Sequence, residues 1–168
     1  MAAIIHTLKL FLVEHLGARL GVLLCAMIPV IELRGAIVLG ALLGMPWQES
    51  YLLSVIGNLL PVPFILLFIT RVIGRMRESK RRFWNKVGDC LAKRAERNRG
   101  RIEKYAFFGL CLFVAVPLPV TGAWTGALVA ATVGMHPVRA LLSILLGVLL
   151  SGVIVTLLAY GAFAVFSI

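Results

Sequence analysis

A break in a long apolar segment constrains this chain more than any other feature of its sequence. Residues 17–45 are largely apolar, but their middle, Ile-Pro-Val-Ile-Glu-Leu-Arg-Gly at 28–35, holds a proline, two charges and a glycine. One α-helix of 29 residues would measure roughly 43 Å, well beyond a hydrocarbon core of about 30 Å. Divided at the break, each arm reaches about the middle of the bilayer. We therefore predict a re-entrant hairpin that enters and leaves on one side, with its irregular backbone buried in protein or facing a wet cavity.

The composition is that of a polytopic membrane protein. Of the 168 residues 61% are hydrophobic, and most of them fall in four long apolar runs. We expect a single membrane domain over residues 1–168, without a cleaved signal peptide. The three cysteines lack the spacing of a metal site or of C-x-x-C, so no metal and no other cofactor is expected.

Positive charge is concentrated in one segment. Residues 71–104 contain 13 Lys and Arg against 4 acidic residues, whereas the rest of the chain sums to only +1. The positive-inside rule places this segment in the cytoplasm and the chain in the inner, cytoplasmic membrane. Within it, apolar residues recur every three or four positions over 81–104, which predicts a basic interfacial helix that contacts anionic lipid headgroups. Nucleic-acid binding is disfavoured, because the segment lies between membrane segments and carries no such motif.

Two further segments are long enough to cross the membrane once. Residues 50–70 are uncharged and 21 residues long. Asn58 and the prolines at 61 and 63 interrupt them and predict a kink or an unwound turn. Residues 140–168 are uncharged and free of proline. Residues 3–16 show the pattern of an amphipathic interfacial helix.

A second broken segment resembles the first. Residues 105–135 form a run of 31 residues without a charge, interrupted by Pro-Leu-Pro-Val-Thr-Gly at 117–122. This length again exceeds a simple crossing. We predict a second hairpin that enters from the cytoplasmic side, because it follows the basic segment.

The two broken segments belong to an internal repeat. A displacement of 90 positions superposes nine identical residues among 32, including the pairs Pro29 and Pro119, Gly44 and Gly134, and Gly57 and Gly147. We therefore predict an all-α integral membrane fold in which repeat 1 (1–73), the basic segment (74–104) and repeat 2 (105–168) follow one another. Each repeat contains an interfacial helix, a re-entrant hairpin and one crossing, so the second is inverted relative to the first.

The breaks are the predicted site. Helices that leave them near Ala36 and Thr125 would aim free amides at the membrane centre and favour an anion there. If the first break is extended, Glu32 and Arg34 point the same way. Glu32, removed from water, would accept a proton readily and so couple transport to protons, whereas a Glu32–Arg34 ion pair that merely holds the hairpin is the structural alternative.

The predicted substrate-binding residues come from both breaks and from the kink of the first crossing. Thr121 and Thr125 would donate to a ligand or cap the second half-helix, Asn58 would face substrate or a neighbouring helix, and Trp124 is more typical of packing. No catalytic constellation is present, so an enzyme is not expected. The set is Pro29, Glu32, Arg34, Gly35, Asn58, Pro117, Pro119, Thr121, Gly122, Trp124 and Thr125.

These motifs resemble those of the small multidrug export protein family. The resemblance rests on Ile-Pro-Val-Ile-Glu-Leu-Arg-Gly at 28–35, Gly-Asn-Leu-Leu-Pro-Val-Pro at 57–63 and Val-Pro-Leu-Pro-Val-Thr-Gly at 116–122. More distantly the chain is similar to the DedA membrane-protein superfamily, a likeness that implies two hairpins and translocation of undecaprenyl phosphate. That group carries arginines in its second hairpin, and residues 105–135 have none.

Three functions remain open from the sequence. The preferred one is a transporter of an amphipathic, anionic, lipid-linked substrate such as a polyprenyl phosphate, and its rivals are a proton-coupled exporter of cationic drugs and a membrane scaffold without transport. A homodimer is expected, because two crossings and two hairpins leave irregular backbone to be shielded. Gly147, Ser151 and Gly152 would offer its packing face.

Overall fold

The computed structural model describes residues 17–77, 102–118 and 121–166, and all regular structure in them is helical. The predicted interfacial helices at 3–16 and 81–104 lie largely or wholly outside these residues. The helices are Gly17–Met27, α2 (Glu32–Leu42), α3 (Trp47–Leu59), α4 (Val62–Arg77), α6 (Ile102–Ala115), α7 (Ala123–Val133) and α8 (Pro137–Phe166).

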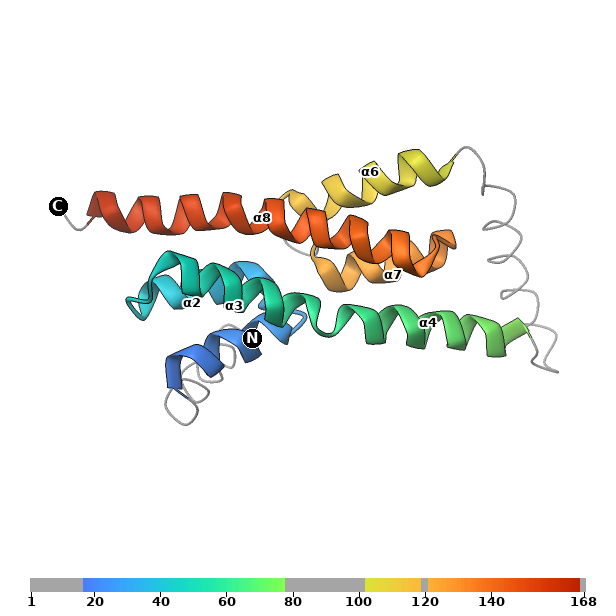
Figure 1. Cartoon of the computed structure of the whole chain (residues 1–168), viewed down its shortest axis with the longest axis horizontal. Helices are drawn as coiled ribbons and strands as arrows, with labels where there is room; N and C mark the ends of the chain where they lie inside the picture. The colour runs from blue at the N-terminus through green and yellow to red at the C-terminus, as the bar shows by residue number, and fades with distance from the viewer. Residues whose placement is uncertain (1–16, 78–101, 119–120, 167–168) are drawn as a thin grey trace.

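Two segments within the described residues are long and apolar enough to cross a membrane, as predicted. Trp47–Ile69 has 23 residues and Pro137–Ala162 has 26. The first is interrupted between α3 and α4, where Pro61 and Pro63 supply no backbone N–H. Figure 1 shows α3 and α4 running end to end alongside α8 in the opposite direction.

The remaining helices form two pairs, each folded back on itself and each too short to cross. Gly17–Met27 and α2 lie beside the half of the molecule that contains α3, and α6 and α7 lie toward α4 (Figure 1). With 11 to 14 residues apiece, these helices measure roughly 16 to 21 Å. The connections inside the two pairs meet near the middle of the molecule. We call residues 28–35 the first tip and residues 116–125, apart from 119 and 120, the second tip.

The turns that follow the two pairs are built alike, at positions 90 apart. The amide of Met45 donates to the carbonyl of Gly40 at 3.0 Å, and that of Met135 donates to Ala130 at 2.9 Å. Gly44 and Gly134 have φ angles of +68° and +75°, a left-handed conformation that glycine adopts without a steric penalty. Both turns thus end a helix with the same hydrogen-bonding pattern before a long apolar segment begins.

The small residues expected at a dimer interface are used inside the monomer instead. A β-carbon at Gly147 would lie 2.7 Å from the Cys111 carbonyl oxygen, and one at Gly152 would lie 2.7 Å from the Tyr51 ring. Ser151 is only 2% exposed. This predicted packing face was wrong, because α6 and α3 already occupy it.

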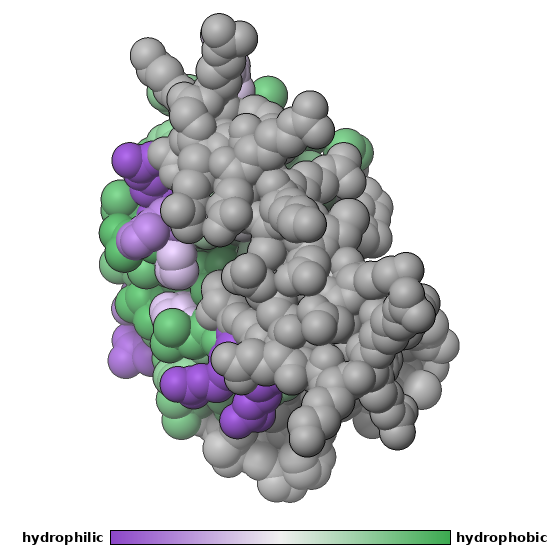
Figure 2. Space-filling model, turned by 90° about the vertical axis from the view of Figure 1, so that its right-hand side faces the viewer, coloured by the Kyte–Doolittle hydropathy of each residue, from purple (hydrophilic) through white to green (hydrophobic). Residues whose placement is uncertain are grey.

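The outer surface has the polarity of a membrane protein. Large apolar side chains such as Phe64, Phe68 and Leu157 are 69–70% exposed. Figure 2 looks onto the end of the molecule that carries the end of α4 and the α7–α8 turn, and hydrophilic residues gather there beside apolar ones. Arg71 and Arg75 of α4 are both exposed.

Candidate functional site

Glu32 anchors the first tip to the second. It is the first residue of α2 and is 7% exposed. Its carboxylate accepts a hydrogen bond from the backbone amide of Trp124, in the first turn of α7. The free amides and the dipole of a helix N-terminus stabilise a negative charge. A carboxylate from one tip therefore occupies the anion-binding end of a helix from the other.

Gly122 makes this contact sterically possible. It is the N-cap residue of α7 and is buried, and a β-carbon added to it would overlap the carboxylate of Glu32. Glu32 itself has a φ of +51°, a conformation that costs a residue with a side chain about 1–2 kcal/mol. The site thus accommodates Glu32 through a missing side chain on one tip and a strained backbone on the other.

Arg34 makes the reciprocal contact at the end of α6. Its guanidinium donates to the carbonyl oxygens of Leu118, of Val116 at 3.0 Å and of Thr121 at 3.1 Å. It also donates to the Thr121 hydroxyl at 3.0 Å, and that hydroxyl lies 2.9 Å from the carbonyl oxygens of Val116 and Leu118. These carbonyls lie in the connection that follows α6, and the C-terminal end of a helix favours a cation.

Trp124 supplies a third link between the tips. Its indole Nε1 donates to the carbonyl oxygen of Met27 at 3.2 Å, at the end of the helix Gly17–Met27. We call these contacts of Glu32, Arg34 and Trp124 the tip clasp. They join residues more than 80 positions apart in the chain.

The first tip differs from its prediction in backbone conformation. The irregular stretch is confined to residues 28–31, so Glu32, Arg34 and Gly35 are helical rather than extended. The first half-helix begins at Glu32 and not near Ala36, whereas the second begins at Ala123, close to the predicted Thr125. No salt bridge joins Glu32 to Arg34 in the described residues. The two charges find opposite helix ends on the second tip instead of each other.

A small polar cavity lies beside the clasp. It has a volume of about 10 Å³ and is lined by Glu32, Arg34, Asn58 and Ser151 together with apolar residues. Asn58 and Ser151, from the two long segments, are each 2% exposed, and Asn58 Oδ1 and Ser151 Oγ have no hydrogen-bond partner. Buried polar atoms without protein partners are typical of a bound water, and the volume suffices for one. Asn58 thus faces this cavity. Ser151 lines it too, although its sequence pattern predicted only a packing role.

The other predicted residues lie around the clasp without entering it. Pro29 and Pro117 are exposed in the tips, Gly35 and Thr125 lie in the first turns of α2 and α7, and Pro119 lies outside the described residues. The carbonyls of Met27, Val116 and Leu118 were not predicted, because every residue carries a carbonyl and side-chain chemistry does not mark it. The exposed Arg19–Glu49 salt bridge at 3.0 Å was also missed.

Comparison with known proteins identifies the family. Searches of curated proteins and of solved structures gave no match. The sequence profile of the family described as "Putative small multi-drug export protein" matches residues 32–154, which is more than half of the chain and includes the clasp residues Glu32, Arg34 and Trp124. The chain therefore belongs to the small multi-drug export protein family of membrane proteins.

Proposed function

We propose that this protein is a membrane transporter that carries an amphipathic substrate past the contact between its two tips. The main support for this proposal is the tip clasp. Charged groups in the interior of a membrane segment are costly, and an apolar contact would hold two hairpins together as well. Two charges that bind backbone groups of the other tip are therefore better explained by a contact that must open than by one that must only hold.

The membrane arrangement in this proposal is that of inverted repeats. The helix pairs are the re-entrant hairpins, Trp47–Ile69 and Pro137–Ala162 are the crossings, and the basic segment is cytoplasmic. The equivalent turns at Gly44 and Gly134 and the opposite directions of the long segments support it. Transporters built in this way bind substrate near the bilayer midplane, between broken helices.

The preferred substrate is anionic and lipid-linked, such as a polyprenyl phosphate. The N-terminus of α7 favours an anion, and here the Glu32 carboxylate fills that position. A proton taken up by Glu32 would neutralise it and weaken its hold on α7. A substrate phosphate would then bind the exposed amides, with Arg34 as its second ligand. Proton uptake and substrate entry are in this way coupled through one carboxylate.

A proton-coupled exporter of cationic drugs is the second candidate. It is favoured by the description of the family and by the burial of Glu32, which would then be the binding group for the cation. The two candidates differ in which charge contacts the ligand. They therefore predict opposite effects of single neutralising substitutions.

Ligand-dependent thermal stabilisation of the purified protein separates these candidates. With undecaprenyl phosphate, Arg34→Gln should lose more of the stabilisation than Glu32→Gln. With tetraphenylphosphonium as the ligand, a cation exporter reverses the order. Arg19→Gln is the matched control, because Arg19 forms an exposed salt bridge far from the tips and should keep the wild-type response. Equal losses with both ligands would instead support a clasp that only stabilises the fold.

The polar cavity yields a second expectation. Asn58→Leu replaces an unpaired buried acceptor with an apolar side chain of similar size, so the melting temperature should be unchanged or higher. Translocation of a fluorescent polyprenyl phosphate in proteoliposomes should nevertheless fall, because the leucine side chain fills the polar cavity beside Glu32. Ser54→Ala removes another unpaired buried oxygen on α3 that does not line this cavity, and it should leave translocation intact. A wild-type rate in Asn58→Leu would contradict a role for this cavity.

A further inference from the structure

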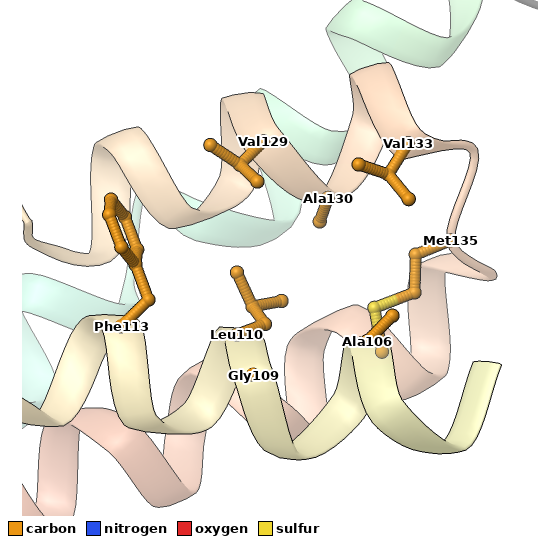
Figure 3. A pocket seen from close by; sticks show the side chains of 8 residues that line it. All are labelled: Ala106, Gly109, Leu110, Phe113, Val129, Ala130, Val133 and Met135. Atoms are coloured by element: carbon orange, nitrogen blue, oxygen red, sulfur yellow. The ribbon is translucent and has the colours of Figure 1, made fainter. Parts of the chain in front are cut away.

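An apolar pocket separates the two helices of the second pair. It lies between α6 and α7, has a volume of about 360 Å³, and is lined almost entirely by carbon atoms. In Figure 3 the side chains of Leu110 and Val129 face each other across it, Phe113 stands at one end, and Ala106 and Met135 stand at the other. This volume falls within the range of ordinary ligand-binding pockets.

Gly109 keeps the pocket open. It lies within α6, where glycine is less favourable than alanine, yet a β-carbon at this position would meet nothing within 4 Å. Close helix packing therefore does not require this glycine. In contrast, Gly126 of α7 and Gly147 of α8 pack so closely against α6 that a β-carbon would lie 2.7 Å from its atoms. Gly109 therefore leaves open space in the pocket and does not serve a close contact between helices.

The two ends of the pocket differ in their surroundings. At the Ala106 and Met135 end, the neighbouring residues Tyr105 and His136 are exposed, Tyr105 to 82%. An exposed tyrosine beside an apolar helix is typical of the membrane–water interface. At the other end, Phe113 lies three residues before Val116, whose carbonyl binds Arg34. The pocket therefore runs from the interface toward the tip clasp over roughly 10 Å of α6.

We propose that this pocket binds the hydrocarbon tail of the transported amphiphile. The wall offers no partner for a headgroup and no hydrogen bond to a water molecule, so an apolar chain is the ligand that it fits. In the proposed membrane arrangement the Ala106 and Met135 end of the pocket lies at the interface, from which such a chain can enter. A tail held here places its polar end beside either the interface or Arg34, the two positions between which a headgroup must move. This inference rests on the proposed function for the identity of the amphiphile.

Photolabelling in nanodiscs tests the pocket without a transport assay. The probe is a polyprenyl phosphate with a diazirine on its isoprenoid chain, and the wild-type protein should be labelled within 106–113 and 129–135. Excess unlabelled polyprenyl phosphate should remove this labelling. Gly109→Trp fills the pocket and should abolish labelling there, whereas Gly161→Trp, at another open glycine of a helix, should not. Gly109→Leu serves the same purpose if the tryptophan variant does not fold, and Gly109→Ala should keep most of the labelling.

Two outcomes would overturn the proposal. One is labelling elsewhere on the protein but not in the pocket. The other is pocket labelling that resists competition and is equal for a phospholipid carrying the diazirine, which would make the pocket a crevice for bulk lipid. Competed labelling in a protein that does not translocate the probe would refute the proposed transport and leave the pocket assignment standing.

Discussion

Substitution of Gly122 by alanine is expected to break the tip clasp. The added methyl group overlaps the Glu32 carboxylate, so one of the tips must move. Overpacking of a buried site typically costs about 1–3 kcal/mol. The loss of the charged contact to α7 adds to this cost. Gly122→Ala should therefore lower the melting temperature in detergent and abolish translocation in proteoliposomes. Gly161→Ala, where a β-carbon meets nothing within 4 Å, should behave like the wild type.

A second substitution should restore the fold but not the activity. Glu32→Gly removes the carboxylate that collides with the new methyl group, and it relieves the positive φ of residue 32. The double variant should regain most of the melting temperature lost in Gly122→Ala, and the double-mutant cycle should show strong coupling between the two positions. Translocation should stay absent. Additive effects would mean that Gly122 matters for a reason other than its contact with Glu32.

The sequence predicted the arrangement of segments because length in a bilayer is a strict constraint. A segment of 29 or 31 residues with a central proline is longer than a simple crossing needs, whereas a run of 21 uncharged residues matches that length. Pro61 and Pro63 likewise marked the division between α3 and α4, because a proline withholds a hydrogen bond wherever it stands. These features act locally, so they can be read from neighbouring residues.

The tip clasp could not be predicted, because its parts interact across the repeats. Glu32 and Arg34 were recognised as costly charges, and the simplest partner for each was the other. In the structure each charge binds backbone groups near the end of a helix instead. Which amides and carbonyls are available there depends on the residue at which the helix begins or ends. The sequence did not place the start of α2 at Glu32, since the residue has a positive φ that tertiary contacts must impose. Ser151 was missed because an isolated serine in an apolar helix is most often a packing residue.

The clasp also explains how one carboxylate and one guanidinium can hold the two tips together. Helix α7 begins at the second tip and α6 ends there, so the tip presents amides on one side and carbonyls on the other. One acidic and one basic residue of the first tip bind both sides, and residues 105–135 contribute no arginine. When Glu32 is neutralised, the amides at the start of α7 lose their anionic partner, whereas Arg34 still donates to the carbonyl oxygens of Val116 and Thr121. The clasp can then loosen on one side without falling apart.

In the proposed arrangement the α2–α3 turn and the α7–α8 turn lie on opposite sides of the membrane. The hydroxyl of Tyr160 donates to the Met45 carbonyl at 2.9 Å, so the end of α8 lies beside the α2–α3 turn. Ala106 and Met135 line the same end of the apolar pocket, so the chain enters and leaves the second pair at one end (Figure 3). We therefore expect the turn at Pro46 to lie outside and the turn at His136 to lie in the cytoplasm with the basic segment.

Single cysteines at these turns give opposite results under the two possible topologies. In a background in which Cys25, Cys90 and Cys111 are replaced, a membrane-impermeant thiol reagent added to intact cells should label Pro46→Cys and spare His136→Cys. A permeant maleimide should label both and shows that each site is reactive. If residues 17–45 and 105–135 each crossed the membrane, both turns would lie outside and both would be labelled by the impermeant reagent. Each broken segment would then have to cross with an irregular stretch in the hydrocarbon core, and neither α6 nor α7 is long enough to span that core alone.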